Sequence, residues 1–282
     1  MMSKVAIVTD STSYIPHDLV AQYNILVAPQ IIIWGEETLR DGIDIKPFEF
    51  YHRLKTAKQM PTTSQVTIAA FADIFERLHQ QGYQILAILI SEKLSGTIDS
   101  AKQASQMLPD ASIEIFDSIS TAMALGFQVL AVARAAADGA TMAECLALAE
   151  NCRQNSGVLF MVDTLEFLHR GGRIGGASRY LGTVLQMKPL LTLEDGRITA
   201  LERVRTKHKA QNRLIEMLIE RLDGKSNIRL ATLHANAEED ARALSEQLKG
   251  RLEIVETIES VVSPVVGTHV GPGTIGMAYM HD

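Results

Sequence analysis

Apolar runs alternate with helical patterns through the first half of the chain. The run ILAILI at 85–90 is continuous, which is typical of a strand buried on both faces of a sheet. The strands predicted in this half are 5–10, 85–90 and 112–117. Apolar residues at helical spacing, with Pro or Gly at several of the ends, predict helices over 16–24, 47–57, 66–82, 95–107 and 120–137. This β-α-β-α order predicts a parallel sheet with helices on both faces.

The pattern changes in the second half. Thr141 and Glu144 match the T-x-x-E signature of a capping box, so a helix is expected to begin at Thr141. Asp195 and Gly196 separate two strand-like runs within 188–205, which predicts a hairpin with a tight turn. Further strands are predicted over 157–162, 227–235 and 252–258, and further helices over 206–222 and 237–248. A hairpin followed by α/β units predicts a mixed sheet.

The length of the chain favours two domains. At 282 residues it exceeds the size that one hydrophobic core usually serves. We therefore expect an α/β domain with a parallel sheet over 1–155 and a second α/β domain with a mixed sheet over 156–282.

Composition excludes several classes of protein. The net charge of −6 argues against a nucleic-acid binder, which should carry a basic surplus. The N-terminal apolar run stops at Asp10, too early for a signal peptide, and the most apolar stretch is interrupted by polar residues. A cytoplasmic protein is expected. Cys145 and Cys152 should pack as free thiols, and the scattered histidines predict no metal site.

The sequence lacks the local motifs of common nucleotide-binding and hydrolase sites, while a triad built from distant residues stays open. GPGTIG at 271–276 matches G-x-G-x-x-G, but that motif requires a helix and an acidic residue about twenty positions later. Only six residues follow it. The chain contains neither G-x-x-x-x-G-K-[ST] nor G-x-S-x-G, so no dinucleotide site, P-loop or nucleophile elbow is predicted.

Polar loops at strand ends and helix starts are the strongest chemical signal. They are TDSTSYIP at 9–16, MPTTSQVT at 60–67, SEKLSGT at 91–97, FDSIST at 116–121 and GTHVGPGT at 267–274. The three loops that follow predicted parallel strands should converge at one sheet edge. Each loop alone is readily explained as a helix N-cap, Ser95 included. Together they favour an anion site built from hydroxyl and backbone N–H groups.

A basic segment gives a second signal. Between 170 and 213 the chain has ten Lys or Arg residues and three acidic ones. The segment is either a solvated face or a docking patch for an acidic partner or phosphate on the second domain, and both interpretations stay open.

Six motifs, in order, resemble those of the DegV family of bacterial lipid-binding proteins. They are TDSTSYIP at 9–16, PTTSQ at 61–65, ISEKLSGTIDSA at 90–101, DTLEFLHRGGRIGG at 163–176, KPLLTLEDGRI at 188–198 with VRT at 204–206, and HVGPGTIG at 269–276. The resemblance implies an N-terminal three-layer α/β/α domain and a smaller two-layer C-terminal domain, with a long-chain fatty acid such as palmitate, stearate or oleate between them. It implies a carrier without a cofactor, which in several bacteria presents the fatty acid to a separate kinase.

The resemblance also implies the residues of the site. Thr63, Ser95 and His269 would hold the lipid carboxylate, the histidine directly or through water. The neighbouring loop residues are Ser64, Gly96 and Thr97. Arg173 of the GGRI motif and Arg205 of the VRT motif are linked to the partner and the phosphate step.

One departure from the family and two alternative functions remain. The family usually has proline after TSQ, where this chain has Val66, so a less rigid loop is expected at Thr63. The main alternative is an enzyme acting on a small anionic or dihydroxyacetone-like substrate, with His269 as the reactive group, and it requires a small polar cavity. A purely regulatory module, without a cavity, is the other. No nucleic-acid partner is expected, and transient membrane contact is compatible with a lipid carrier.

Overall fold

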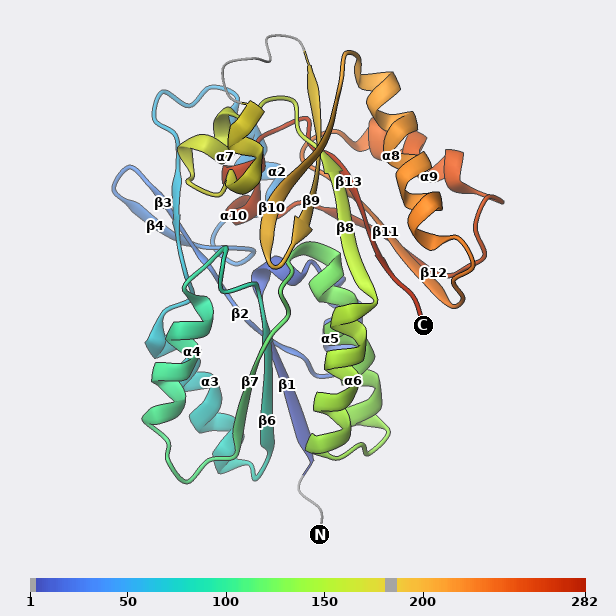
Figure 1. Ribbon diagram of the computed structural model, residues 1–282. Coiled ribbons are helices and arrows are strands. Elements are labelled where there is room, and N and C mark those ends of the chain that lie inside the picture. The colour runs from blue at the N-terminus through green and yellow to red at the C-terminus, as the bar shows by residue number, and fades with distance from the viewer. Residues whose placement is uncertain (1–3, 181–186) are drawn as a thin grey trace.

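The computed structural model describes residues 4–180 and 187–282. The chain forms two units, and the lower one in Figure 1 contains a parallel sheet in the order β2-β1-β6-β7. Its strands are β1 (Val5–Asp10), β2 (Leu26–Ala28), β6 (Gln84–Leu89) and β7 (Ile113–Asp117). One face is covered by α3 (Ile68–Gln80) and α4 (Thr97–Gln106), and the other by α5 (Ala122–Ala137) with α6 (Met142–Gln154) beside it. The predicted three-layer α/β/α arrangement is confirmed.

Burial explains how the layers are ordered. Successive residues of β1 point to opposite faces, so Ala6 and Val8 pack toward α3 and α4 while Val5 and Ile7 pack toward α5. Helix α5 is apolar on all sides, and 11 of its 16 residues are buried. It contacts β1 and β6 below and β8 and β13 above. A helix that is apolar all round must be enclosed, and here α5 joins the cores of the two units.

The upper unit contains a six-stranded mixed sheet in the order β10-β9-β8-β13-β11-β12. Its strands are β8 (Ser156–Met161), β9 (Lys188–Glu194), β10 (Arg197–Val204), β11 (Ile228–His234), β12 (Ile254–Val261) and β13 (Ile275–Met280). Only β11 and β12 pair in parallel. Helices α8 (Lys207–Leu222) and α9 (Glu238–Leu248) cover its outer face, which gives the predicted two-layer mixed unit.

Several local predictions are confirmed. The β9–β10 hairpin turns at Asp195 and Gly196, whose φ angles of 48° and 76° suit a tight hairpin turn. Thr141 and Glu144 form the capping box at the start of α6. Cys145 and Cys152 are free and buried.

Two segments predicted as loops are regular structure. Residues 61–65 contain β5 (Thr62–Ser64), which joins β3 (Ile31–Trp34) and β4 (Glu37–Arg40) in a small antiparallel sheet. A short strand of Thr and Ser has no apolar alternation and forms because it pairs with an edge of β3. The GTHVGPGT segment begins inside α10 (Pro264–Val270), which is capped by Ser263 and starts with Pro264.

The remaining helices are short and lie in both units. They are η1 (Ser11–Ser13), α1 (His17–Gln22), α2 (Pro47–Leu54), α7 (Glu166–Arg170) and η2 (Gly175–Tyr180).

Candidate ligand-binding site

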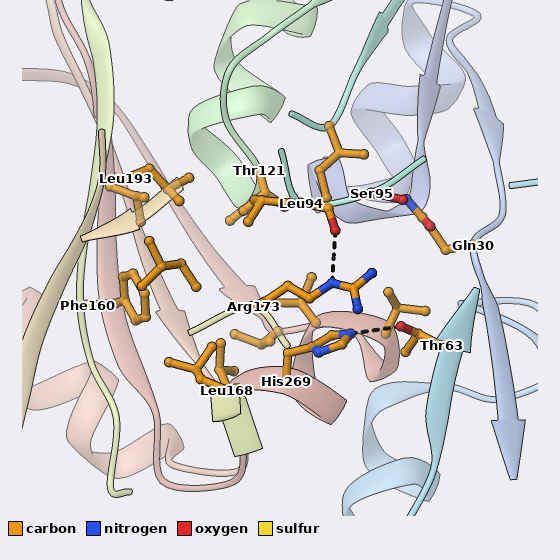
Figure 2. Close-up of a pocket in the computed structure, with 18 of the residues that line it drawn as sticks. Gln30, Thr63, Leu94, Ser95, Thr121, Phe160, Leu168, Arg173, Leu193 and His269 are labelled. Carbon is orange, nitrogen blue, oxygen red and sulfur yellow. Dashed lines mark hydrogen bonds between the residues drawn. The ribbon is translucent and has the colours of Figure 1, made fainter. Parts of the chain in front are cut away.

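A cavity lies where the carboxyl ends of the parallel strands meet the upper sheet and α10 (Figure 2). It holds about 890 Å³ of space outside protein atoms, its open mouth included, and its lining is mostly apolar. The apolar lining from the upper unit comprises Val158, Phe160, Leu193, Ile198, Leu233, Val262, Val265, Val266 and Val270. Figure 2 shows Phe160 and Leu193 on one side of the cavity and the polar residues Thr63, Ser95 and Gln30 on the other. The cavity is therefore a mostly apolar chamber with polar groups gathered toward one side.

Thr63 and His269 meet on the polar side. Thr63 Oγ1 and His269 Nε2 are 2.8 Å apart and hydrogen-bond across 206 positions of sequence. Pairing of β5 with β3 places the threonine, and α10 carries the histidine. Burial, followed by the charge of Arg173, lowers the pKa of His269 to about 4, so its ring is neutral at physiological pH. A neutral His269 can donate its Nε2 proton to Thr63, which leaves the Thr63 hydroxyl proton for a ligand.

Ser95 lies across the polar side of the cavity from Thr63 and His269, just before α4. Its Oγ is 2.9 Å from Thr97 Oγ1, and Thr97 in turn accepts a hydrogen bond of 3.0 Å from Gln30 Nε2. The N-cap of α4 is Gly96, with no side-chain hydrogen bond, so the interpretation of Ser95 as a helix cap is wrong. Its hydroxyl is bound to Thr97 and not to the backbone N–H groups of the first turn.

Arg173 connects the two sides. Its Nε donates to the Leu94 carbonyl oxygen at 3.0 Å (Figure 2). Its Nη1 donates to the Gly171 carbonyl oxygen at 2.7 Å. Arg173 lines the cavity, and so does Ser64, whereas Arg205 follows the end of β10 and is exposed outside it. The structure thus separates the two arginines that the motifs had grouped.

Two buried carboxylates support the site from behind. Asp10 accepts hydrogen bonds from the backbone N–H groups of Ile90 and Thr12, and Asp41 accepts from Ser11 Oγ at 2.6 Å and from the Val265 N–H of α10. Burial raises the pKa of Asp10 and raises that of Asp41 to about 7. These contacts join the loops after β1, β4 and β6 to α10, in line with the predicted convergence of the loops.

The sequence did not point to the supporting residues. Gln30 is a single polar residue between the apolar runs ILVAP and IIIW, and that interruption is the one signal that could have drawn attention to it. Asp10 belongs to the segment TDSTSYIP, which indicated hydroxyl and N–H groups and not a supporting carboxylate, and Asp41 lies in a loop sequence of ordinary composition, where a carboxylate is equally common on a solvated surface.

The basic segment is partly neutralised by acidic residues. Lys188 pairs with Asp163 at 2.6 Å, Lys207 pairs with Asp240, and Arg213 pairs with three glutamates. Four of these acidic partners, Asp163, Glu216, Glu220 and Asp240, come from outside 170–213, so a count within the segment could not include them. The segment is therefore less positive in the structure than in the sequence.

Two features are absent from the described residues. No group of three or more His, Cys, Asp or Glu within 4–180 and 187–282 is placed to hold a metal ion. In the same residues, no helix has both the length and the apolar character needed to cross a membrane.

Comparison with known proteins gives consistent matches over the whole length. The family model described as "Uncharacterised protein, DegV family" matches residues 4–282. A DegV domain-containing protein of Halalkalibacterium halodurans is 34% identical over 280 residues, which cover 99% of each chain.

Solved structures of DegV proteins share the fold. A Thermus thermophilus DegV family protein described as binding fatty acid has a TM-score of 0.93 and 34% identity, covering 99% of this chain and 100% of its own. Bacillus subtilis DegV, described as a fatty acid binding protein, has a TM-score of 0.89 and 32% identity, with coverage of 99% and 100%. On the family-model match and these full-length relatives, the chain belongs to the DegV family.

Proposed function

We propose that the protein binds one long-chain fatty acid between its two units, which we divide near residue 155. The observation that carries the proposal is the mostly apolar cavity with two hydroxyls, Thr63 and Ser95, on its polar side. The apolar chain would fill the cavity and the carboxylate would accept hydrogen bonds from both hydroxyls. Relatives from Thermus thermophilus and Bacillus subtilis, described as fatty acid binding, support the assignment.

The energetics suit a fatty acid held without a bidentate ion pair. A saturated tail of about 14–16 methylenes gains roughly 10 kcal/mol on burial, at about 0.8 kcal/mol each, before entropic losses. Hydrogen bonds from Thr63 and Ser95 then need only orient the carboxylate. An arginine bound to both carboxylate oxygens would hold the carboxylate more strongly, but it would occupy the oxygen that must attack a phosphoryl donor.

The alternative of a small-substrate enzyme is less well supported. It requires a small polar cavity with a reactive histidine, but the cavity is mostly apolar and the neutral His269 is hydrogen-bonded to Thr63. We propose a carrier whose ligand is palmitate, stearate or oleate, and whose chemistry, where it occurs, is performed in the cytoplasm by a fatty-acid kinase that supplies ATP. Transient contact with a membrane surface would load the lipid.

The binding proposal predicts that the purified protein carries lipid. Native mass spectrometry should show a mass increment that extracts as free fatty acid, and delipidated protein should take up labelled palmitate or oleate at one site per chain. Decanoate, with a shorter tail, should bind at least tenfold more weakly because fewer methylenes are buried. Protein that carries no lipid and takes up neither palmitate nor oleate would contradict the proposal.

The kinase proposal predicts a separate role for Arg173. Arg173→Ala should retain bound palmitate but reduce acyl-phosphate formation by a bacterial fatty-acid kinase and ATP at least tenfold, because the guanidinium would no longer meet the developing phosphate charge. Arg242→Ala on α9 removes the same charge far from the cavity and serves as the matched control. Loss of palmitate binding in Arg173→Ala would show that Arg173 holds the carboxylate instead.

A further inference from the structure

Gln30 is a buried polar residue that lines the same cavity and has no role in the function proposed above. It lies between β2 and β3 and is 2% exposed. Its backbone N–H donates to Ser11 Oγ at 3.1 Å, and its carbonyl oxygen accepts from the Asp41 N–H at 2.9 Å. Both backbone polar groups of Gln30 are thus hydrogen-bonded, which fixes the position of the Cα from which its side chain extends toward the site.

The orientation of the Gln30 amide follows from its neighbours. Both oxygens of Asp10 accept backbone N–H groups, so this carboxylate acts as an acceptor. Gln30 Nε2 is 3.4 Å from Asp10 Oδ1 and 3.0 Å from Thr97 Oγ1. An amide nitrogen only donates, so Thr97 receives a proton from Gln30 and does not give one to it.

The direction of the next hydrogen bond is then determined. Thr97 is fully buried, and within the described part of the chain its hydroxyl contacts only Gln30 and Ser95. A buried hydroxyl proton without an acceptor is costly, so the Thr97 proton goes to Ser95 Oγ. The Ser95 proton is then free to point into the cavity. On the other side, His269 Nδ1 is buried without a hydrogen-bond partner among the described residues, and an unpaired acceptor there costs less than an unpaired N–H. The neutral ring is therefore assigned its proton on Nε2, from which it donates to Thr63.

We infer that Gln30 is a positioning residue which, acting through Thr97, orients the Ser95 hydroxyl as a donor and so makes the site selective for a carboxylate over a neutral alcohol head group. The inference rests on the proposed fatty-acid function. A carboxylate only accepts, and it can take a proton from each hydroxyl. A long-chain alcohol has a single oxygen that must also donate its own proton. Because the Ser95 and Thr63 protons both point at that oxygen, neither hydroxyl presents a lone pair toward it.

Gln30→Glu tests this direction because it changes the amide to a carboxyl of nearly the same shape. Once ionised, the new carboxyl accepts from Thr97, and Thr97 then accepts from Ser95, which turns the Ser95 proton away from the ligand. Because the carboxyl of Asp10 lies 3.4 Å from the Gln30 amide nitrogen, the introduced group should ionise above its ordinary range, and while protonated it still donates. Between pH 6 and 9, on the order of a tenfold or greater fall in palmitate affinity is expected, relative to wild type.

The measurement compares labelled palmitate with labelled hexadecanol, both delivered from cyclodextrin, across that pH range. For Gln30→Glu the acid-over-alcohol affinity ratio should fall at least tenfold as pH rises, while the wild-type ratio should change little. Gln30→Met retains the packing volume without donor or acceptor and should give an intermediate ratio that is independent of pH.

Thr97→Val provides a second test in case Gln30→Glu does not fold. It removes the hydroxyl that links Gln30 to Ser95 with little change of shape. It should lower the acid-over-alcohol ratio without the pH dependence. An unchanged ratio in both Gln30→Glu and Thr97→Val, with wild type binding palmitate normally, would overturn the inference and leave the proposed function intact. Wild type that binds neither probe would instead contradict the function itself.

Discussion

Replacing Thr63 and Ser95 together by alanine is expected to reduce palmitate affinity by about a hundred- to ten-thousandfold. Each hydroxyl would donate one hydrogen bond to a charged oxygen, and such bonds contribute roughly 1.5–3 kcal/mol each. The tail contacts stay, so residual binding should persist and should no longer distinguish an acid from its methyl ester. Isothermal titration of delipidated protein with palmitate and methyl palmitate measures both effects.

The matched control removes the same two hydroxyls elsewhere. Thr62→Ala with Ser105→Ala changes one residue of β5 and one of α4, neither of which lines the cavity. That control should bind palmitate as wild type does. If Thr63→Ala with Ser95→Ala bound palmitate equally well, the carboxylate would have to lie elsewhere, with Arg173 the nearest alternative.

Substituting Gly171 by alanine is expected to disrupt the site through a single methyl group. The backbone there is right-handed, with φ of −75°, so alanine is conformationally acceptable. Its Cβ, however, would lie 2.0 Å from His269 Nδ1 and 2.8 Å from Cε1, so the ring must leave the position in which it meets Thr63. Overpacking of this kind costs about 1–3 kcal/mol, and the lost hydrogen bond adds about 1 kcal/mol. Thermal denaturation should show the midpoint falling by roughly 5–10 °C, and palmitate affinity should fall at least tenfold.

Two further variants test whether the effect of Gly171→Ala comes from the clash with His269. Gly176→Ala meets nothing closer than 3.8 Å and should be tolerated. Gly171→Ala combined with His269→Ala should be no less stable than His269→Ala alone, because the clashing ring is absent. If the combination were instead additive, the alanine would be acting on something other than His269.

The local elements were predictable because their signals lie within a few residues. The capping box of Thr141 and Glu144 needs only a separation of three, and the Asp195-Gly196 turn needs adjacent residues that tolerate positive φ. The run at 85–90 became β6 because an unbroken apolar run this short fits a strand that is covered on both faces. Such patterns record burial, and burial was enough to give the fold class.

The same kind of signal failed for β5 and α10. Thr62–Ser64 has no apolar periodicity, and its strand depends on the edge of β3. Helix α10 is seven residues long, too short for a helical period to be recognised, and it is stabilised by Ser263 and by the distant Asp41. Elements stabilised by remote partners leave little trace in their own sequence.

The sequence by itself determined the two α/β units and, through family motifs, named Thr63, Ser95 and His269 as candidate site residues. Only the tertiary structure brought Thr63 to His269 across 206 positions and enclosed an apolar chamber beside them. Only the structure placed Gln30 behind Ser95, where the direction of each hydrogen bond can be assigned. The physical reason is that apolar periodicity reports whether a residue is buried, whereas a hydrogen bond depends on which atom lies opposite, and that is decided when distant segments pack together.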